Sequence, residues 1–230
     1  MSKRSLFFYL LLIYSLVSCD SSHNTTNSSE GKIVYKVNYP KLSSDNILFE
    51  MMPKSMNYSF SEKGSKSEIS AGMGLFRSAY IHNTDANTFR QTVKILNKKY
   101  QSSYTKDSFL AMNPKFQNIV FIESEKDTVI LGYNCNITNF SFNNDTTQHT
   151  VYYTTEIGGK NPNITTPFEQ IPGIMLKYTV ENFGVMMDFT AEKIVISDIE
   201  ESIFEISNEY ALVTPEELKV QIESIFMMTK

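Results

Sequence analysis

The 230-residue chain is poor in several residue types on which common architectures depend. It has no Trp, two Cys and three His, and its 21 basic and 25 acidic residues give a formal net charge of −4. Two Cys exclude a disulfide-stapled scaffold and a multi-Cys zinc site. A slightly acidic chain lacks the basic face of nucleic-acid-binding proteins, so no nucleic-acid partner is expected. Aromatic residues are abundant, with 16 Phe and 13 Tyr, and the 41% hydrophobic content indicates a globular protein.

The N-terminus has the organisation of a secretory signal peptide. Lys3 and Arg4 form a basic start, and the apolar run at residues 6–17 is shorter than the ~20 residues that cross a bilayer. Residues 16–19 (LVSC) then fit a bacterial lipobox, in which the thiol of Cys19 receives a diacylglycerol group and the chain is cleaved before it. The alternative is an ordinary secretory signal that happens to end in Cys.

We therefore expect a signal peptide at residues 1–18 and lipidation at Cys19. Residues 20–30 contain Ser, Thr and Asn but no apolar residue, so residues 19–30 are expected to be a lipidated Cys and a flexible tether. Loss of Lys3 and Arg4 leaves 19 basic and 25 acidic residues, a net charge of −6. The expected location is the cell envelope, with the outer membrane as first expectation; the sequence leaves membrane and leaflet open.

Residues 31–230 are interpreted as one domain made mostly of strands, because apolar residues recur at every second position. The inward positions of the clearest segments are Ile33, Tyr35, Val37 and Tyr39; Met56, Tyr58 and Phe60; Val151, Tyr153, Thr155 and Ile157; Ile174, Leu176, Tyr178 and Val180; and Val185, Met187 and Phe189. Further strands are expected near residues 66–71, 75–82, 88–96, 99–104, 118–124, 128–139, 192–197 and 201–207. Turns are expected at 62–64, 125–127, 143–145 and 182–184. A change of apolar parity within 133–142 predicts a bulge near Asn139.

Helical signals are few. A short helix through residues 44–52 is expected, capped by Ser44 or Asp45. A second begins at the C-terminal capping box of Thr214 and Glu217, with Pro215 at its first position. Its apolar stripe is Leu218, Ile222, Ile225 and Phe226. Residues 158–168 are expected to be a loop. The predicted fold class is mainly β (α+β), a curved antiparallel sheet or half-barrel with a few helices, including the C-terminal one.

Residues that could carry catalysis are scarce. The chain has no Gly-x-Ser-x-Gly elbow, phosphate loop or His-Glu-x-x-His motif, and the fragments at 72–74 (GMG) and 158–160 (GGK) are interpreted as turns. His82, near Asp85, and His149, near Asp145, are candidates for a general base or metal ligand, although a structural role is expected for each. Cys135 lies in an apolar strand and is expected to be a small buried hydrophobe. No catalytic residue, metal or cofactor is predicted, and the protein is predicted not to be an enzyme.

Several segments carry a family resemblance in their order and spacing. They are residues 52–60 (MPKSMNYSF), 131–135 (LGYNC), 151–157 (VYYTTEI) and 171–176 (IPGIML). Over roughly residues 31–200 the chain resembles the GLPGLI family of Bacteroidetes envelope proteins and its relatives of unknown function. It departs from the name-giving motif at residues 171–175, as a relative would. The resemblance implies a half-barrel similar to the lipoprotein carriers LolA, LolB and LppX, with helices across the concave face. It brings no catalytic residues.

The expected function is a lipid-anchored periplasmic or envelope binding protein. It would be attached to the membrane through Cys19 and would hold an apolar ligand or acyl chain in a half-barrel cavity; the sequence does not identify the ligand-binding residues. Inward alternation is the same whether aromatic residues line a cavity or fill a core. An envelope scaffold with a filled core and a protein partner is therefore the alternative, and an enzyme using His82 or His149 is the remote one.

Overall fold

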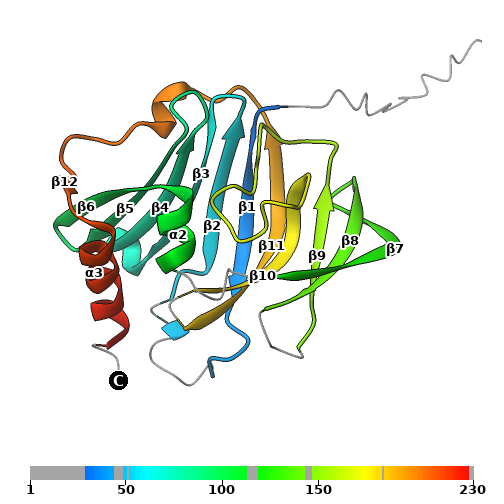
Figure 1. Cartoon of the computed structure of the whole chain (residues 1–230), viewed down its shortest axis with the longest axis horizontal. Coiled ribbons are helices and arrows are strands. Elements are labelled where there is room, and N and C mark those ends of the chain that lie inside the picture. The colour runs from blue at the N-terminus through cyan, green and yellow to red at the C-terminus, as the bar shows by residue number, and fades with distance from the viewer. Residues whose placement is uncertain are drawn as a thin grey trace, which may run out of the picture.

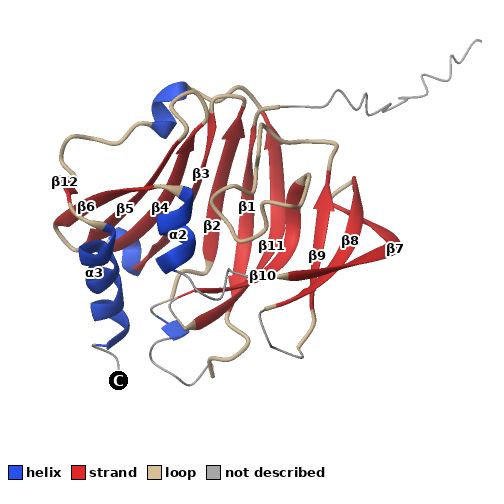
Figure 2. Cartoon of the chain, viewed as in Figure 1, coloured by secondary structure: helices blue, strands red, loops and turns tan. Residues whose placement is uncertain are grey.

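The computed structural model describes residues 29–43, 49–50, 52–112, 119–142, 147–182 and 184–227, and the strands among them form one large curved sheet that stays open (Figures 1 and 2). The strands are β1 (Gly31–Asn38), β2 (Ser55–Ser61), β3 (Gly64–Ala71), β4 (Phe76–Asn83), β5 (Thr88–Ile95), β6 (Lys98–Tyr104), β7 (Val120–Ile130), β8 (Tyr133–Ser141), β9 (His149–Thr154), β10 (Ile174–Asn182), β11 (Val185–Ile196) and β12 (Ala211–Leu212). The predicted fold class is confirmed.

Two meanders meet at the first strand. The sheet order is β12-β6-β5-β4-β3-β2-β1-β11-β10-β9-β8-β7, so β1 pairs with β2 on one side and with β11 on the other. All pairs are antiparallel except β12 with β6, which is parallel. The alternation predicted for β1 is confirmed, since Ile33, Tyr35 and Val37 are buried and lie between exposed or half-buried residues.

Directly paired residues share one face of a sheet, which allows the two faces to be assigned. Tyr58 pairs with Ser67, and Ser67 pairs with Tyr80, so all three lie on one face, here called the inner face. The opposite face of β4 carries Ala79 and Ile81, which pack against residues of η3 (Glu201–Phe204) and the segment before it. The sheet therefore has an apolar cover on both sides.

Three elements cover the inner face (Figure 1). Helix α2 (Lys106–Met112) places the ring of Phe109 edge-on to Tyr80, with ring centroids 5.8 Å apart. Helix α3 (Pro215–Met227) packs Leu218 and Ile222 against Val93 of β5. Residues 158–173, here called the cover segment, insert the fully buried Phe168 beside Phe140, with ring centroids 4.8 Å apart.

The C-terminal capping box is confirmed. The Thr214 backbone N–H donates to Glu217 Oε2 at 2.9 Å, and the Glu217 N–H donates to Thr214 Oγ1 at 3.2 Å. Leu218 and Ile222 are buried as predicted. The side chains of Ile225 and Phe226, most of the helix expected at 44–52 and the turn expected at 143–145 lie outside the described residues.

Several boundaries predicted from the sequence are wrong. The turn expected at 125–127 lies inside β7, and the chain turns instead at Leu131 and Gly132, which have φ values of 53° and 88°. Residues 192–197 belong mostly to the long strand β11 rather than to a separate strand. Residues 201–207 contain η3, a short 3₁₀ helix, instead of a strand.

Two strands, β7 and β10, have an irregular register with a neighbouring strand. The bulge predicted near Asn139 is displaced: the register shifts between Glu123 and Asp127 of β7, which pair with Thr138 and Asn136 of β8. β8 itself pairs with β9 without a shift from Asn136 to Phe140, so no bulge lies at Asn139 and the register does not explain the change of parity in β8. A shift between Met175 and Lys177 in β10 buries three consecutive residues from Ile174 onward. In β9, Tyr153 is only half-buried and Thr154 is buried instead.

Among the described residues, no helix is both long and apolar enough to cross a membrane. The predicted signal peptide, Cys19 and nearly all of the tether lie outside those residues.

Candidate functional site

A cavity of about 120 Å³ lies between the inner face of the sheet and its covers. Its floor comes from β1, β2, β3, β4, β10 and β11, and its cover comes from α2 and the cover segment. The described residues that line it are Tyr35, Met56, Tyr58, Ser67, Ile69, Ser78, Tyr80, Phe109, Pro162, Asn163, Thr165, Thr166, Pro167, Ile174, Met175, Tyr178, Val180, Asn182, Met187 and Phe189. Most of this surface is apolar.

Buried tyrosines join the floor of the cavity to its surroundings. Tyr58 Oη donates to the carbonyl oxygen of Pro162 in the cover segment at 2.7 Å, and Tyr35 Oη donates to the carbonyl oxygen of Met175 at 2.8 Å. Burial raises the pKa of both phenols well above the usual 10, so both stay protonated and remain donors at neutral pH. The first bond joins the floor to the cover segment, and the second joins β1 to β10 within the floor.

Aromatic stacking sets the shape of the next part of the wall. Tyr178 lies parallel to Phe189 with centroids 4.9 Å apart, and Tyr35 meets Tyr178 edge-on at 5.9 Å. Such offset or edge-to-face pairs contribute roughly 0.5–1.5 kcal/mol each beyond their burial. The rings therefore form a rigid wall, while Met56 and Met187 provide adaptable surface beside it.

The cover segment owes its shape to one side chain and one close approach. Asn163 Nδ2 donates to the carbonyl oxygens of Ile171 and Gly173, both at 2.8 Å. A Cβ at Gly159 would lie 2.2 Å from the carbonyl oxygen of Ser61, so only glycine allows the segment to approach β2 this closely. Close packing against β2 therefore requires glycine at position 159.

A polar network runs along the inner face beside the cavity. Tyr104 Oη donates to Gln91 Oε1 at 2.9 Å, and Gln91 Nε2 donates to Ser78 Oγ at 3.4 Å. Burial raises the pKa of Tyr80 to about 12, against the opposing effect of hydrogen bonds from Asn182 and Gln91. Tyr80 lies on β4 and Asn182 on β10, and four strands separate these two in the sheet order, so their contact spans the curve of the sheet.

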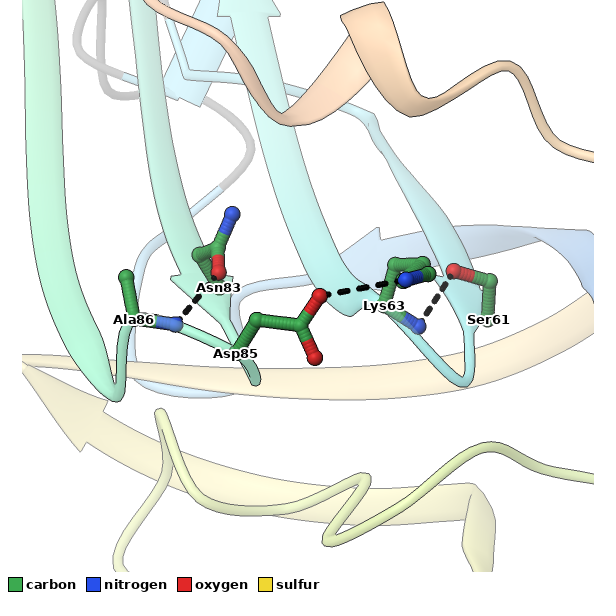
Figure 3. Close-up of polar contacts among 5 residues, drawn as sticks. All are labelled: Ser61, Lys63, Asn83, Asp85 and Ala86. Carbon is green, nitrogen blue, oxygen red and sulfur yellow. Dashed lines mark hydrogen bonds and ion pairs between the residues drawn. The ribbon is translucent and has the colours of Figure 1, made fainter.

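His82 does not meet the partner that the sequence suggested. His82 is 2% exposed, its ring centroid lies 5.1 Å from that of Phe89, and burial lowers its pKa. Asp85 lies in the neighbouring turn and forms an ion pair with Lys63 at 3.2 Å instead (Figure 3). His82 is not among the described residues that line the cavity.

His149 and Cys135 also lie among apolar side chains. His149 stacks on Phe140 with centroids 5.3 Å apart, and its expected neighbour Asp145 lies outside the described residues. Cys135 is 1% exposed, and burial raises the pKa of its thiol, as predicted for a buried hydrophobe. In the described part of the chain, no group of three or more His, Cys, Asp or Glu is placed to hold a metal ion.

The polar residues of the cavity were not predicted from the sequence. Ser67, Ser78 and Asn182 fall on strands whose polar positions resemble a solvent-facing side. The pairing of β2 with β3 would have indicated that Ser67 faces the cavity, because it places Ser67 opposite Tyr58 on the same face.

Comparisons with known proteins are informative about fold alone. No family model matches the chain, and no curated protein matches it. Two solved structures of PNGF-II, in the P21 and C2 space groups, superpose with TM-scores of 0.52 and 0.51 at 15% and 16% sequence identity. Each match covers 84% of this chain, which spans about a third of the length of PNGF-II (33% and 32%). At this identity the likeness supports the open curved sheet and carries no activity with it.

Proposed function

We propose that the protein is a lipid-anchored envelope protein that binds an apolar ligand in the cavity beneath its cover segment. The observation that carries the proposal is the cavity itself, an opening of about 120 Å³ in an interior otherwise packed with aromatic rings. Concave, mostly apolar pockets with a few polar groups are the usual sites of small-molecule binding in proteins. The mostly apolar lining of this cavity favours an apolar occupant.

The size of the cavity limits the ligand. Sites for drug-sized molecules have volumes of roughly 300–1,000 Å³, whereas an apolar cavity of about 150 Å³ takes benzene. At about 120 Å³, this cavity suits a single ring or a short alkyl segment. A complete lipid would insert only the end of one acyl chain.

Attachment to a membrane through Cys19 is the second part of the proposal, and it rests on the lipobox of the sequence. The tether would hold the start of β1 close to the bilayer, where apolar ligands partition. We expect cells supplied with labelled palmitate to label the full chain but not its Cys19→Ala variant. Equal labelling of both would contradict lipidation at this residue.

The binding function is tested on the chain from residue 20 to residue 230, here called the anchor-free chain. It lacks Cys19 but keeps every strand and helix that the structure describes. After purification without detergent, native mass spectrometry is expected to detect an additional apolar molecule that denaturation releases. An unoccupied chain that also fails to take up any component of an envelope lipid extract would contradict ligand binding.

A second candidate function is an interaction lipoprotein, favoured by the edge of the sheet. β7 is the last strand in the sheet order, and Val120, Ile122 and Val129 on it are between 44% and 63% exposed. Exposed apolar edge strands pair with other chains. A photo-crosslinker at Val129 should then capture one dominant envelope protein in cells, whereas the same group at the exposed Lys98 of β6 should not.

A further inference from the structure

The floor of the cavity has a polar corner, formed by Ser67, Ser78, Tyr80 and Asn182. Ser67 and Tyr80 are direct cross-strand neighbours, and Ser78 lies two residues from Tyr80 on the same strand. Asn182 reaches this corner from β10 and interacts with Tyr80. The remaining wall is formed largely by Met, Ile, Val and aromatic side chains. An occupant would therefore meet a mostly apolar surface, with polar atoms at this corner of the floor and at Asn163, Thr165 and Thr166 of the cover.

The hydrogen bonds of the corner leave one acceptor unused. A hydrogen bond that lowers the pKa of a phenol is one that its oxygen accepts, so Asn182 approaches Tyr80 with its Nδ2 donor. The other amide atom, Asn182 Oδ1, is buried and has no hydrogen-bond partner in the described part of the chain. A buried acceptor without a partner is unfavourable, and a donor brought by a ligand would remove this penalty.

The lining also excludes charged head groups. None of the described residues that line the cavity is Asp, Glu, Lys, Arg or His. Burial keeps Tyr35, Tyr58, Tyr80 and Tyr178 protonated at neutral pH. A carboxylate, phosphate or ammonium group entering the cavity would lose its hydration without gaining an opposite charge.

From the uncharged lining and the unpartnered acceptor, we infer that the ligand is an uncharged amphiphile with one O–H or N–H donor. An alcohol, a phenol or a primary amide has such a donor, which binds Asn182 Oδ1. The inference rests on the proposed binding function and specifies its ligand class. Asn182 is then the residue that selects for the polar end of the ligand, and the apolar wall accepts its chain.

Three probes of similar length distinguish the requirement for a hydrogen-bond donor from the requirement for zero charge. 1-Hexanol is neutral and has a donor; its isomer 1-methoxypentane is neutral and has an acceptor only; hexanoate is charged at pH 7.4. We expect calorimetric titration of the anchor-free chain to give 1-hexanol an affinity roughly fivefold above that of 1-methoxypentane, the effect of one net hydrogen bond. Hexanoate should show no saturable binding.

Two variants assign the preference to one atom. Asn182→Leu removes the acceptor at similar volume, so the two neutral probes should bind with equal affinity. Tyr80→Phe keeps Asn182 Oδ1, so the fivefold preference should persist; this variant also serves if Asn182→Leu does not fold. Equal binding of both neutral probes to the unsubstituted chain, or preferred binding of hexanoate, would overturn the inference and leave the binding function standing. Failure of every probe to bind would overturn both.

Discussion

Tyr58 connects the floor of the cavity to its cover through a single hydrogen bond to the Pro162 carbonyl. Its ring also stacks on Phe60, with centroids 6.0 Å apart, so the hydroxyl can be removed without removing the packing. At this scale the site depends on individual buried polar atoms, each of which has a defined partner or, at Asn182 Oδ1, lacks one.

Tyr58→Phe should lower the free energy of unfolding by about 1 kcal/mol, because it leaves the Pro162 carbonyl without its donor. Urea denaturation of the anchor-free chain measures the change. Tyr152→Phe is the control, since that ring lies half-exposed beside Lys177 and should keep its contact. A Tyr58→Phe variant as stable as the unsubstituted chain would show that this bond does not hold the cover segment.

His82 should make stability depend on pH. Burial lowers its pKa, and both ring nitrogens are buried without a hydrogen-bond partner among the described residues, so the folded chain holds the ring neutral. An unfolded chain takes up this proton near pH 6.5. The unfolded state therefore binds more protons below about pH 6.5, and stability falls as the pH drops from there toward the lowered pKa of the folded state.

Urea midpoints at pH 7.5 and pH 5.5 test this dependence. The urea midpoint of the unsubstituted chain should be lower at pH 5.5 than at pH 7.5. His82→Phe keeps a ring beside Phe89 and should make this decrease smaller. The same pH dependence in both proteins would contradict the assignment to His82.

At the scale of elements, both helices that cover the inner face begin at local capping hydrogen bonds. Helix α3 begins at the reciprocal bonds between Thr214 and Glu217 and buries Leu218 and Ile222. Helix α2 begins in a similar way, with the Ser108 N–H donating to Thr105 Oγ1 and the Thr105 N–H donating to Ser108 Oγ.

Thr214→Ala should cost about 1 kcal/mol of stability by leaving an N-terminal amide of α3 without its acceptor. Hydrogen exchange should become faster in α3 first, because that helix packs on the edge of the sheet against β6. Thr214→Ser keeps the oxygen and should behave like the unsubstituted chain. Unchanged exchange in the Ala variant would exclude a role for the capping box.

Some of these elements could be predicted from local sequence patterns, and others could not. The strict alternation of β1 and the capping box of α3 each predict their element because local chemistry and burial agree. The turn at Leu131 and Gly132 was missed because residues 125–127 have stronger turn chemistry, yet the irregular register of β7 accommodates them within a strand. Helix α2 was missed because seven residues are too few for an apolar stripe, although Thr105 and Ser108 carried a capping signal.

The cavity could not be predicted from any local pattern. Tyr35 and Tyr58 alternate inward in the same way whether they line a void or fill it. Asn182 becomes part of the site only because the sheet curves enough to bring β10 across to β4. Curvature of this kind arises from twist and register over many strands, and a single strand's sequence does not encode it.

For the whole molecule, backbone ladders and side-chain burial hold the twelve strands together. Cys135 is unpaired and buried, and the described residues contain no disulfide. The sheet order joins two meanders through β1 and β11, so the cavity lies where they meet. A ligand bound at this junction would contact strands of both meanders and would stabilise the folded chain.

The measurement that tests ligand binding most directly is calorimetric titration of 1-hexanol into the anchor-free chain and two matched variants. Ile69 lines the cavity, and Ile95 is a half-buried residue of the same face that packs in the cluster under α3. We predict saturable binding to the unsubstituted chain and to Ile95→Phe, and a loss of roughly tenfold or more in Ile69→Phe, whose ring occupies the space. Undetectable binding to the unsubstituted chain, or equal binding by the two variants, would contradict a ligand site in this cavity.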